Sequence, residues 1–137
     1  MDVAKEEVEC VIHSLQRCLK KTQFIDRFCE IFISSSEEIS KRFKNVELSL
    51  QKLMLKNSLQ IMVLYASGHL SVEQSGMRRL AQLHNRYHHD ISPELYNFWL
   101  DSMVAAVKEQ DTEFTPKLEH ACRSTMLHGI EYMRSKY

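Results

Sequence analysis

LAQLHNRYHHDISPELYNFWL, residues 80–100, decides the fold of this chain, because it places three histidines within six positions and a strong helix start directly after them. His84 and His88 are four residues apart, so on a continuous helix both rings lie on one face, about one turn from each other. His88 and His89 are expected to be solvated near the end of that helix, where partial positive charge is favourable. His84 follows Leu80 by one helical turn, and its ring is therefore expected to face the interior.

The composition fits a cytoplasmic protein with one domain spanning residues 1–137. Its 18 basic and 18 acidic side chains balance, which argues against nucleic acid or an anionic membrane as a partner. The N-terminus is acidic and lacks the pattern of a signal peptide, and no apolar stretch is long enough to span a bilayer. No Cys-x-x-Cys pair or paired framework occurs, so reduced thiols are expected at Cys10, Cys18, Cys29 and Cys122.

The spacing of apolar residues predicts an all-α protein. Only three glycines and two prolines interrupt the chain, no hairpin signal occurs, and apolar residues recur every three or four positions. Ser-Pro-Glu at 92–94 and Thr-Pro-Lys at 115–117 each combine a capping side chain with a proline that suits a first helical turn. Helices are expected at about 3–20, 23–33, 37–43, 48–67, 72–87, 93–109 and 116–136, the fourth ended by Gly68.

Two metal sites are conceivable around the histidines. The zinc-protease pattern His-Glu-x-x-His needs a glutamate general base, which the residues between His84 and His88 do not supply. The pairs His69/Glu73 and His84/His88 resemble the ligand spacing of haemerythrin, a four-helix di-iron oxygen carrier. The break at Gly68 and the short distance between the two pairs argue against that arrangement, which is kept as a minor alternative.

The same stretch resembles the proximal segment of a globin. In globins a short helix presents one histidine to the haem iron, an apolar residue follows, and the next helix opens with an aromatic side chain. His84, Ile91 and Tyr96 stand in that order here. The resemblance implies a globin-like fold of about six to eight helices around a haem pocket, with His84 as the iron ligand.

An upstream segment resembles the second and third helices of bacterial single-domain and sensor-type globins. Residues 24–32 form an aromatic-rich helix that includes Phe28, and Phe43 matches the phenylalanine that packs flat on the haem in that family. The resemblance covers almost the whole chain. Cys29 departs from the pattern, because many bacterial globins carry there a tyrosine that donates a hydrogen bond to oxygen, and a thiol is a weak donor.

The helix expected at 48–67 should supply the rest of the distal wall. One polar face is suggested by Lys44, Lys52, Lys56 and Gln60. The rotation of 100° per residue then puts Leu50 or Gln51, Met54, Ser58, Ile61 and Met62 on the opposite side. The candidates over the iron are Gln51, Met54 and Ser58. The full set of expected haem-contacting residues is Phe28, Cys29, Phe43, Gln51, Met54, Ser58, Met62, Ile91 and Tyr96.

The resemblance implies a function as well as a fold. It predicts haem b as cofactor and a diatomic gas as ligand, in storage, sensing or nitric oxide detoxification, the last with an external reductase. A homodimer through the last two helices, or a reductase or signalling partner, is expected. The main alternative is a haemless globin-like regulatory domain. Hydrolase and transferase functions lack any phosphate-binding loop or nucleophile motif in this sequence.

Overall fold

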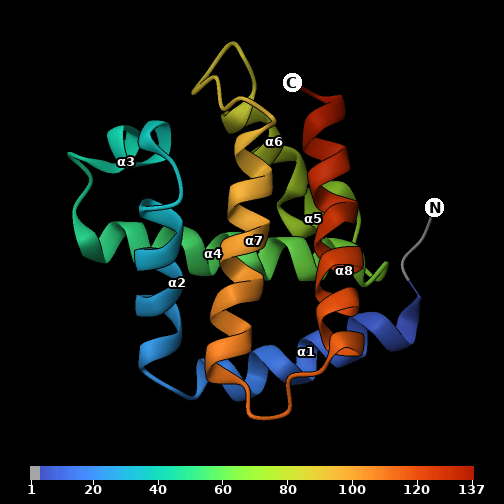
Figure 1. Ribbon diagram of the computed structural model, residues 1–137. Coiled ribbons are helices and arrows are strands. Elements are labelled where there is room, and N and C mark those ends of the chain that lie inside the picture. Colours follow the sequence, from blue (N-terminus) through green and yellow to red (C-terminus); the bar gives the residue numbers. More distant parts are fainter. Residues whose placement is uncertain (1–3) are drawn as a thin grey trace.

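The computed structural model describes residues 4–137 and contains eight helices and no strand within them (Figure 1). In Figure 1, α2, α7 and α8 stand upright, α4 crosses behind them, and α1 runs across their lower ends. Contacts join α2 to α7, α1 to α8, and α4 to both α2 and α8. The helices are α1 (Lys5–Leu19), α2 (Gln23–Ile33), α3 (Glu37–Phe43), α4 (Leu48–Ala66), α5 (Val72–Ser75), α6 (Met77–His84), α7 (Leu95–Gln110) and α8 (Pro116–Ser135).

Local sequence signals explain most of the helix ends. Ser36 caps α3 by accepting a hydrogen bond from the Ile39 amide, and Thr115 caps α8 in the same way, with Pro116 in the first turn. Gly68 follows α4 with a φ of +76°, the left-handed conformation that ends a helix. These starts and stops confirm the all-α prediction. The predicted first residue of the first helix, Val3, lies outside the described residues.

Two predicted boundaries are wrong. The helix expected at 72–87 is two helices, because Gly76 has a φ of +88° and separates α5 from α6, and α6 ends at His84. Helix α7 begins at Leu95 without a side-chain cap, because the Ser92 hydroxyl donates to the Glu94 carboxylate instead of accepting from the helix backbone. The end of α6 at His84 and the start of α7 at Leu95 set the length of the loop between them.

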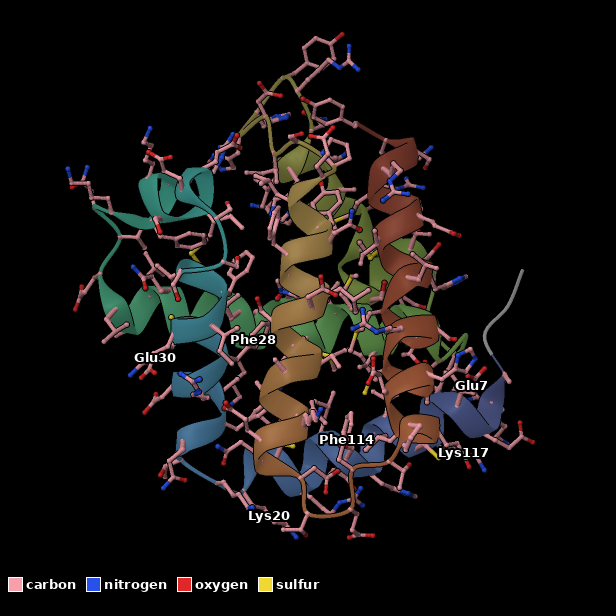
Figure 2. The ribbon with its side chains drawn as sticks, viewed as in Figure 1. Glu7, Lys20, Phe28, Glu30, Phe114 and Lys117 are labelled. Carbon is pink, nitrogen blue, oxygen red and sulfur yellow. The ribbon has the colours of Figure 1, made fainter. Side chains whose placement is uncertain are left out.

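The core is built from the aromatic face of α2 and the inner faces of α4, α7 and α8. Phe28 lies between α2 and α7 (Figure 2), with its ring centroid 5.9 Å from that of Trp99. Gly129 lets α8 approach α4 closely: a Cβ atom there would lie 2.5 Å from the Met62 sulfur. In the described part of the chain, no helix is both long enough and apolar enough to cross a membrane.

Candidate functional site

His84 is the last residue of α6 and points toward α7. Met77, Ala81 and His84 follow one another at intervals of four and three residues, and the first two are buried, so the histidine continues the inner face of the helix. Its ring lies nearly parallel to the ring of Tyr96, with the centroids 6.1 Å apart. The prediction that this ring faces the interior is therefore confirmed, and His88 and His89 are exposed as predicted.

The His84 ring lacks the partner that a buried imidazole normally has. Its Nδ1 atom is buried and makes no hydrogen bond; among the described residues, the only other such side-chain atom is the Thr125 hydroxyl oxygen. Burial lowers the pKa of His84 to about 4, and the nearby His89 acts in the same direction. The ring is therefore neutral at physiological pH, which is the form that donates an electron pair to a metal.

The loop after His84 is tied back to the end of the helix. The Ile91 amide donates to the His84 carbonyl at 2.9 Å, and the His89 amide donates to the Leu83 carbonyl at 3.1 Å. Ile91 itself is half-buried and packs against the core. This loop therefore places an apolar side chain near the histidine, in the order that the sequence predicts.

Phe43 and His84 come from distant parts of the chain, and one arginine brings their elements together. Arg42, which precedes Phe43 at the end of α3, donates to the carbonyls of His89 and Asp90 at 3.1 and 2.9 Å. Phe43 is half-buried, with its ring centroid 5.9 Å from that of Phe32 in an edge-to-face arrangement. The two residues on which the haem prediction depends are thus carried by elements in direct contact.

Gln51 is buried at the start of α4 and all of its amide groups are engaged. Its Nε2 atom donates to the carbonyls of Phe43 and Val46 at 3.0 and 2.8 Å, and its Oε1 accepts from the Cys29 thiol at 3.5 Å. Burial raises the pKa of Cys29, so the sulfur stays protonated. Cys29 and Gln51, predicted separately from the sequence, therefore form one hydrogen-bonded unit that links α2, α4 and the end of α3.

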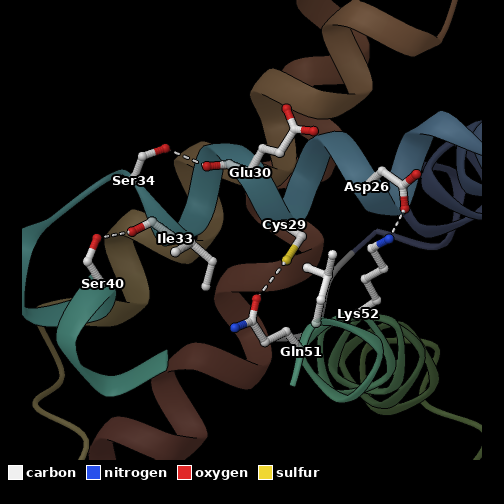
Figure 3. A pocket seen from close by; sticks show the side chains of 9 residues that line it. Asp26, Cys29, Glu30, Ile33, Ser34, Ser40, Gln51 and Lys52 are labelled. Atoms are coloured by element: carbon white, nitrogen blue, oxygen red, sulfur yellow. Dashed lines mark hydrogen bonds and ion pairs between the residues drawn. The ribbon is translucent and has the colours of Figure 1, made fainter. Parts of the chain in front are cut away.

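An open hollow of about 480 Å³ lies on the outer side of this unit (Figure 3). An ion pair between Lys52 and Asp26, 2.9 Å long, lies at its edge. A second hollow, of about 340 Å³, lies between α6 and the end of α8. Neither hollow is lined by His84 or Phe43.

Two of the other predicted pocket residues face inward. Met62 is fully buried beneath Gly129, and Tyr96 is buried, which raises the pKa of its hydroxyl to about 12. Ser58 is half-buried; it accepts a hydrogen bond from the Trp99 indole at 3.2 Å and donates to the Leu55 carbonyl at 2.7 Å. Its hydroxyl is thus already paired.

The predicted pocket residues of α4 differ in burial. Gln51 and Met62 are buried, while Met54 is 46% exposed and Leu50, the alternative to Gln51, is 48% exposed. The face of α4 that packs into the core is formed by Gln51, Leu55, Leu59 and Met62, spaced as on one side of a helix. Leu55 and Leu59 were not among the predicted residues, although the spacing from Gln51 to Met62 would have found them.

The described residues do not supply a ligand set for the di-iron alternative. No group of three or more His, Cys, Asp or Glu side chains there is placed to hold a metal ion. His69 and Glu73 are exposed, and His88 turns outward beyond the end of α6, away from the histidine with which it would have to cooperate. Of the residues predicted to bind a metal, His84 therefore remains the candidate.

Eight helices, with a half-buried histidine at the end of the sixth, agree with the globin-like fold that the sequence predicts. No protein-family model matches the chain, and no curated protein matches it significantly. A solved structure does: a Pseudomonas aeruginosa PAO1 protein whose crystal structure is described as structurally highly homologous to a human hemoglobin has a TM-score of 0.90 and 35% identity, over 96% of this chain and 98% of that one. The chain belongs to the globin family, as the sequence predicts.

Proposed function

We propose that the protein binds haem b through His84 and that a diatomic gas, oxygen, nitric oxide or carbon monoxide, binds on the opposite side of that group. The observation that carries the proposal is the His84 ring, which is neutral, turned inward and without a partner for its buried Nδ1 atom. A buried polar atom without a hydrogen-bond partner lowers the stability of the fold by about 1–3 kcal/mol. Such atoms are rare in packed cores, so this one indicates a ligand site. A neutral imidazole is also the usual axial ligand of a globin haem.

The surroundings of His84 suit a flat apolar cofactor. Tyr96 is buried and stacks on the His84 ring, and Ile91 is half-buried and bonded to the His84 backbone, so both offer carbon surface rather than charge. Phe43, which the resemblance assigns to the haem, is also half-buried. When bound, haem would supply the iron that carries the gas. The protein would supply the imidazole, hold it at the end of α6, and keep water away from the site.

The distal side offers little hydrogen bonding to a bound gas. The Gln51 amide already donates to two backbone carbonyls, and the Cys29 thiol donates to Gln51. Met54 is exposed, and its thioether has no polar hydrogen to donate. We therefore expect gas selectivity to rest on the size and apolar character of the site more than on a polar donor, which disfavours oxygen relative to carbon monoxide.

The test is an absorption spectrum of the reduced protein with and without carbon monoxide. A strong Soret band that shifts with carbon monoxide is expected, and His84→Ala should lose the axial ligation while retaining the helical circular dichroism spectrum. His88→Ala, at an exposed position on the same loop, is the matched control and should leave the spectrum unchanged. Haem spectra that His84→Ala does not alter would remove His84 from the role.

A second candidate, a haemless globin-like regulatory domain, rests on a separate observation. Leu55, Leu59 and Met62 are already almost fully buried, and neither hollow is lined by His84. A colourless preparation that rejects added hemin would favour this candidate. The proposal further places the protein in the cytoplasm and assigns gas binding to storage, sensing or nitric oxide detoxification, with a reductase or signalling partner.

A further inference from the structure

The hollow between α6 and the end of α8, called here the α6–α8 hollow, is separate from the candidate haem site. Its two elements are in contact and lie near the C-terminal end of the chain in Figure 1. Neither His84 nor any other residue predicted to contact haem lines it. Its volume of about 340 Å³ is typical of a site for a small molecule. The lining residues are Arg78, Ala81, Gln82, Asn85, Tyr132 and Lys136.

The polar residues of α6 that line the hollow form one stripe. Arg78, Gln82 and Asn85 follow one another at intervals of four and three residues, so their side chains lie on the same side of the helix. Ala81 lies at the edge of this stripe and is buried. Because alanine carries only a methyl group, it leaves open the space between the stripe and α8 that a larger side chain would fill.

The α6–α8 hollow is lined by two cations and by no acid. Arg78 comes from α6, and Lys136 comes from the other wall, directly after α8. The hollow beside Cys29 differs, because Asp26 and Glu30 line it together with Lys52. Residues 77–89, which include all of α6, contain three arginines and no acidic residue. The electrostatic potential in the α6–α8 hollow therefore favours an anion.

Both cations are held in place by neighbouring side chains. The Lys136 Nζ atom lies 5.7 Å from the centroid of the Tyr132 ring, a cation–π contact. The Arg78 Nη1 atom pairs with Glu73 at 2.7 Å, outside the lining of the hollow. This pair is exposed to water and therefore weak, and a guanidinium has five N–H donors, so Arg78 can still bind an anion. Side chains that are already ordered lose less entropy when a ligand binds.

We propose that the α6–α8 hollow binds a small organic dianion, such as a dicarboxylate, with one negative end on Arg78 and the other on Lys136. Because the two cations come from opposite walls, a ligand with two negative ends can pair with both. The planar guanidinium matches the geometry of a carboxylate or a phosphate. The Asn85 Oδ1 atom accepts from the Tyr87 amide at 3.0 Å, which leaves the Nδ2 group of Asn85 to donate to the ligand.

The expected affinity is modest. Arg78 and Lys136 are exposed, so water and salt screen their charges, and binding should weaken as the salt concentration rises. A dissociation constant of roughly 0.1–1 mM is expected at low ionic strength. Haem does not enter the argument, so the inference stands or falls apart from the proposed function.

The test is a titration of the full chain with succinate at low ionic strength, followed through the amide shifts in nitrogen–proton NMR spectra. The amides of residues 78–86 and 132–136 should shift to saturation. Acetate should bind at least about tenfold more weakly, because its single carboxylate reaches only one of the two cations. Inorganic phosphate is the third probe. If phosphate saturates the same amides at lower concentrations than succinate, the site is supported and its dianion is a phosphate.

Substitutions on the two walls test the position of the site. Arg78→Gln and Lys136→Gln should each weaken succinate binding at least about fivefold, because each removes one of the two charges. Their circular dichroism spectra should not change, since both residues are exposed. Lys117→Gln is the matched control: it removes the same charge from an exposed residue at the opposite end of α8 (Figure 2) and should leave binding unchanged. The proposal would be overturned if neither succinate nor phosphate gave saturable shifts, if acetate bound as tightly as succinate, or if Lys117→Gln weakened binding as much as Lys136→Gln.

Discussion

His84 owes its neutrality to its place on α6. Two buried residues, Met77 and Ala81, precede it on the same face of the helix, so the imidazole lies on the side of α6 that is shielded from water. The loss of hydration disfavours the charged form, so the pKa falls from its ordinary value of 6.5 to about 4. His88 and His89 have the same side chain four and five residues later, but they lie beyond the end of the helix and are exposed.

This shift predicts a pH dependence for the haem-free protein. Between pH 6.5 and 4 the unfolded chain binds a proton at His84 and the folded chain does not, so the free energy of unfolding should fall as the pH falls through that window. The loss is at most about 3 kcal/mol. Urea titrations of wild type and His84→Gln across this range should show the wild type losing more stability. His88→Gln is the control; if it flattens the curve and His84→Gln does not, the assignment to His84 is wrong.

At the scale of single helices, Gly76 determines where α6 begins. Its φ of +88° lies in the left-handed region, which ends α5 and redirects the chain so that α6 can present His84. The space around it is not the constraint, because a Cβ there would make only an ordinary 3.5 Å contact with Ile61. The backbone conformation is what requires glycine.

Gly76→Ala should therefore lower the free energy of unfolding by about 1–2 kcal/mol, the usual cost of a left-handed conformation for an L-residue. Gly76→Asn is the matched variant and should cost less, because asparagine tolerates this region better. Chemical denaturation measures both. Equal losses for alanine and asparagine would show that the left-handed conformation is not the source of the cost.

Helix α4 shows how far the sequence predicts the fold and where it stops. The ends of α4 follow from apolar spacing and Gly68, and the structure confirms them to within one residue. Its rotation does not follow, because apolar side chains on opposite faces leave two orientations with similar burial. The prediction took the face opposite the lysines and Gln60, which includes Gln51 and Met62, while the contacts with α2 and α8 also bury Leu55 and Leu59 and leave Met54 exposed. The hydrogen bond between Cys29 and Gln51 could not be predicted either, because it depends on how α2 packs against α4.

At the scale of the whole molecule, one buried carboxylate ties the first helix to the turn that precedes the last helix. Asp111, at the end of α7, accepts hydrogen bonds from the Ser14 hydroxyl at 2.6 Å and from two nitrogens of Arg17 at 2.9 Å. These bonds hold α1 against the turn between α7 and α8. Hydrogen bonding to Arg17 keeps the pKa of Asp111 near 2, below its ordinary value of 3.8.

Asp111→Ala should destabilise the fold by about 3 kcal/mol, because it leaves a buried hydroxyl and a guanidinium without their acceptor. Stability should also fall in the wild type as the pH drops from 3.8 toward 2, where the carboxylate becomes protonated. Asp101→Asn is the control, since Asp101 is exposed in its pair with Arg123, and it should cost less than about 1 kcal/mol. Comparable losses for the two variants would contradict the structural role given to Asp111.

The loop after His84 is held from two sides that are far apart in sequence. Arg42 donates to its carbonyls from the end of α3, and at the other side the Tyr137 hydroxyl donates to the Asp90 carboxylate. Arg86 stacks over the Tyr137 ring, with its guanidinium carbon 4.9 Å from the ring centroid. Movement of either anchor should therefore reach the segment that follows the histidine.

Removing the α3 anchor should loosen this loop without unfolding the protein. Arg42→Ala removes two hydrogen bonds at a partly exposed site, so the global free energy of unfolding should drop by no more than about 1–2 kcal/mol. The amides of residues 86–91 should exchange with solvent faster by roughly tenfold, while those of α7 keep their protection. Lys41→Ala, which removes an exposed pair with Glu37 one residue away, is the control and should leave the loop unchanged. Unaltered exchange in Arg42→Ala would mean that the end of α3, and Phe43 with it, is mechanically independent of the loop after His84.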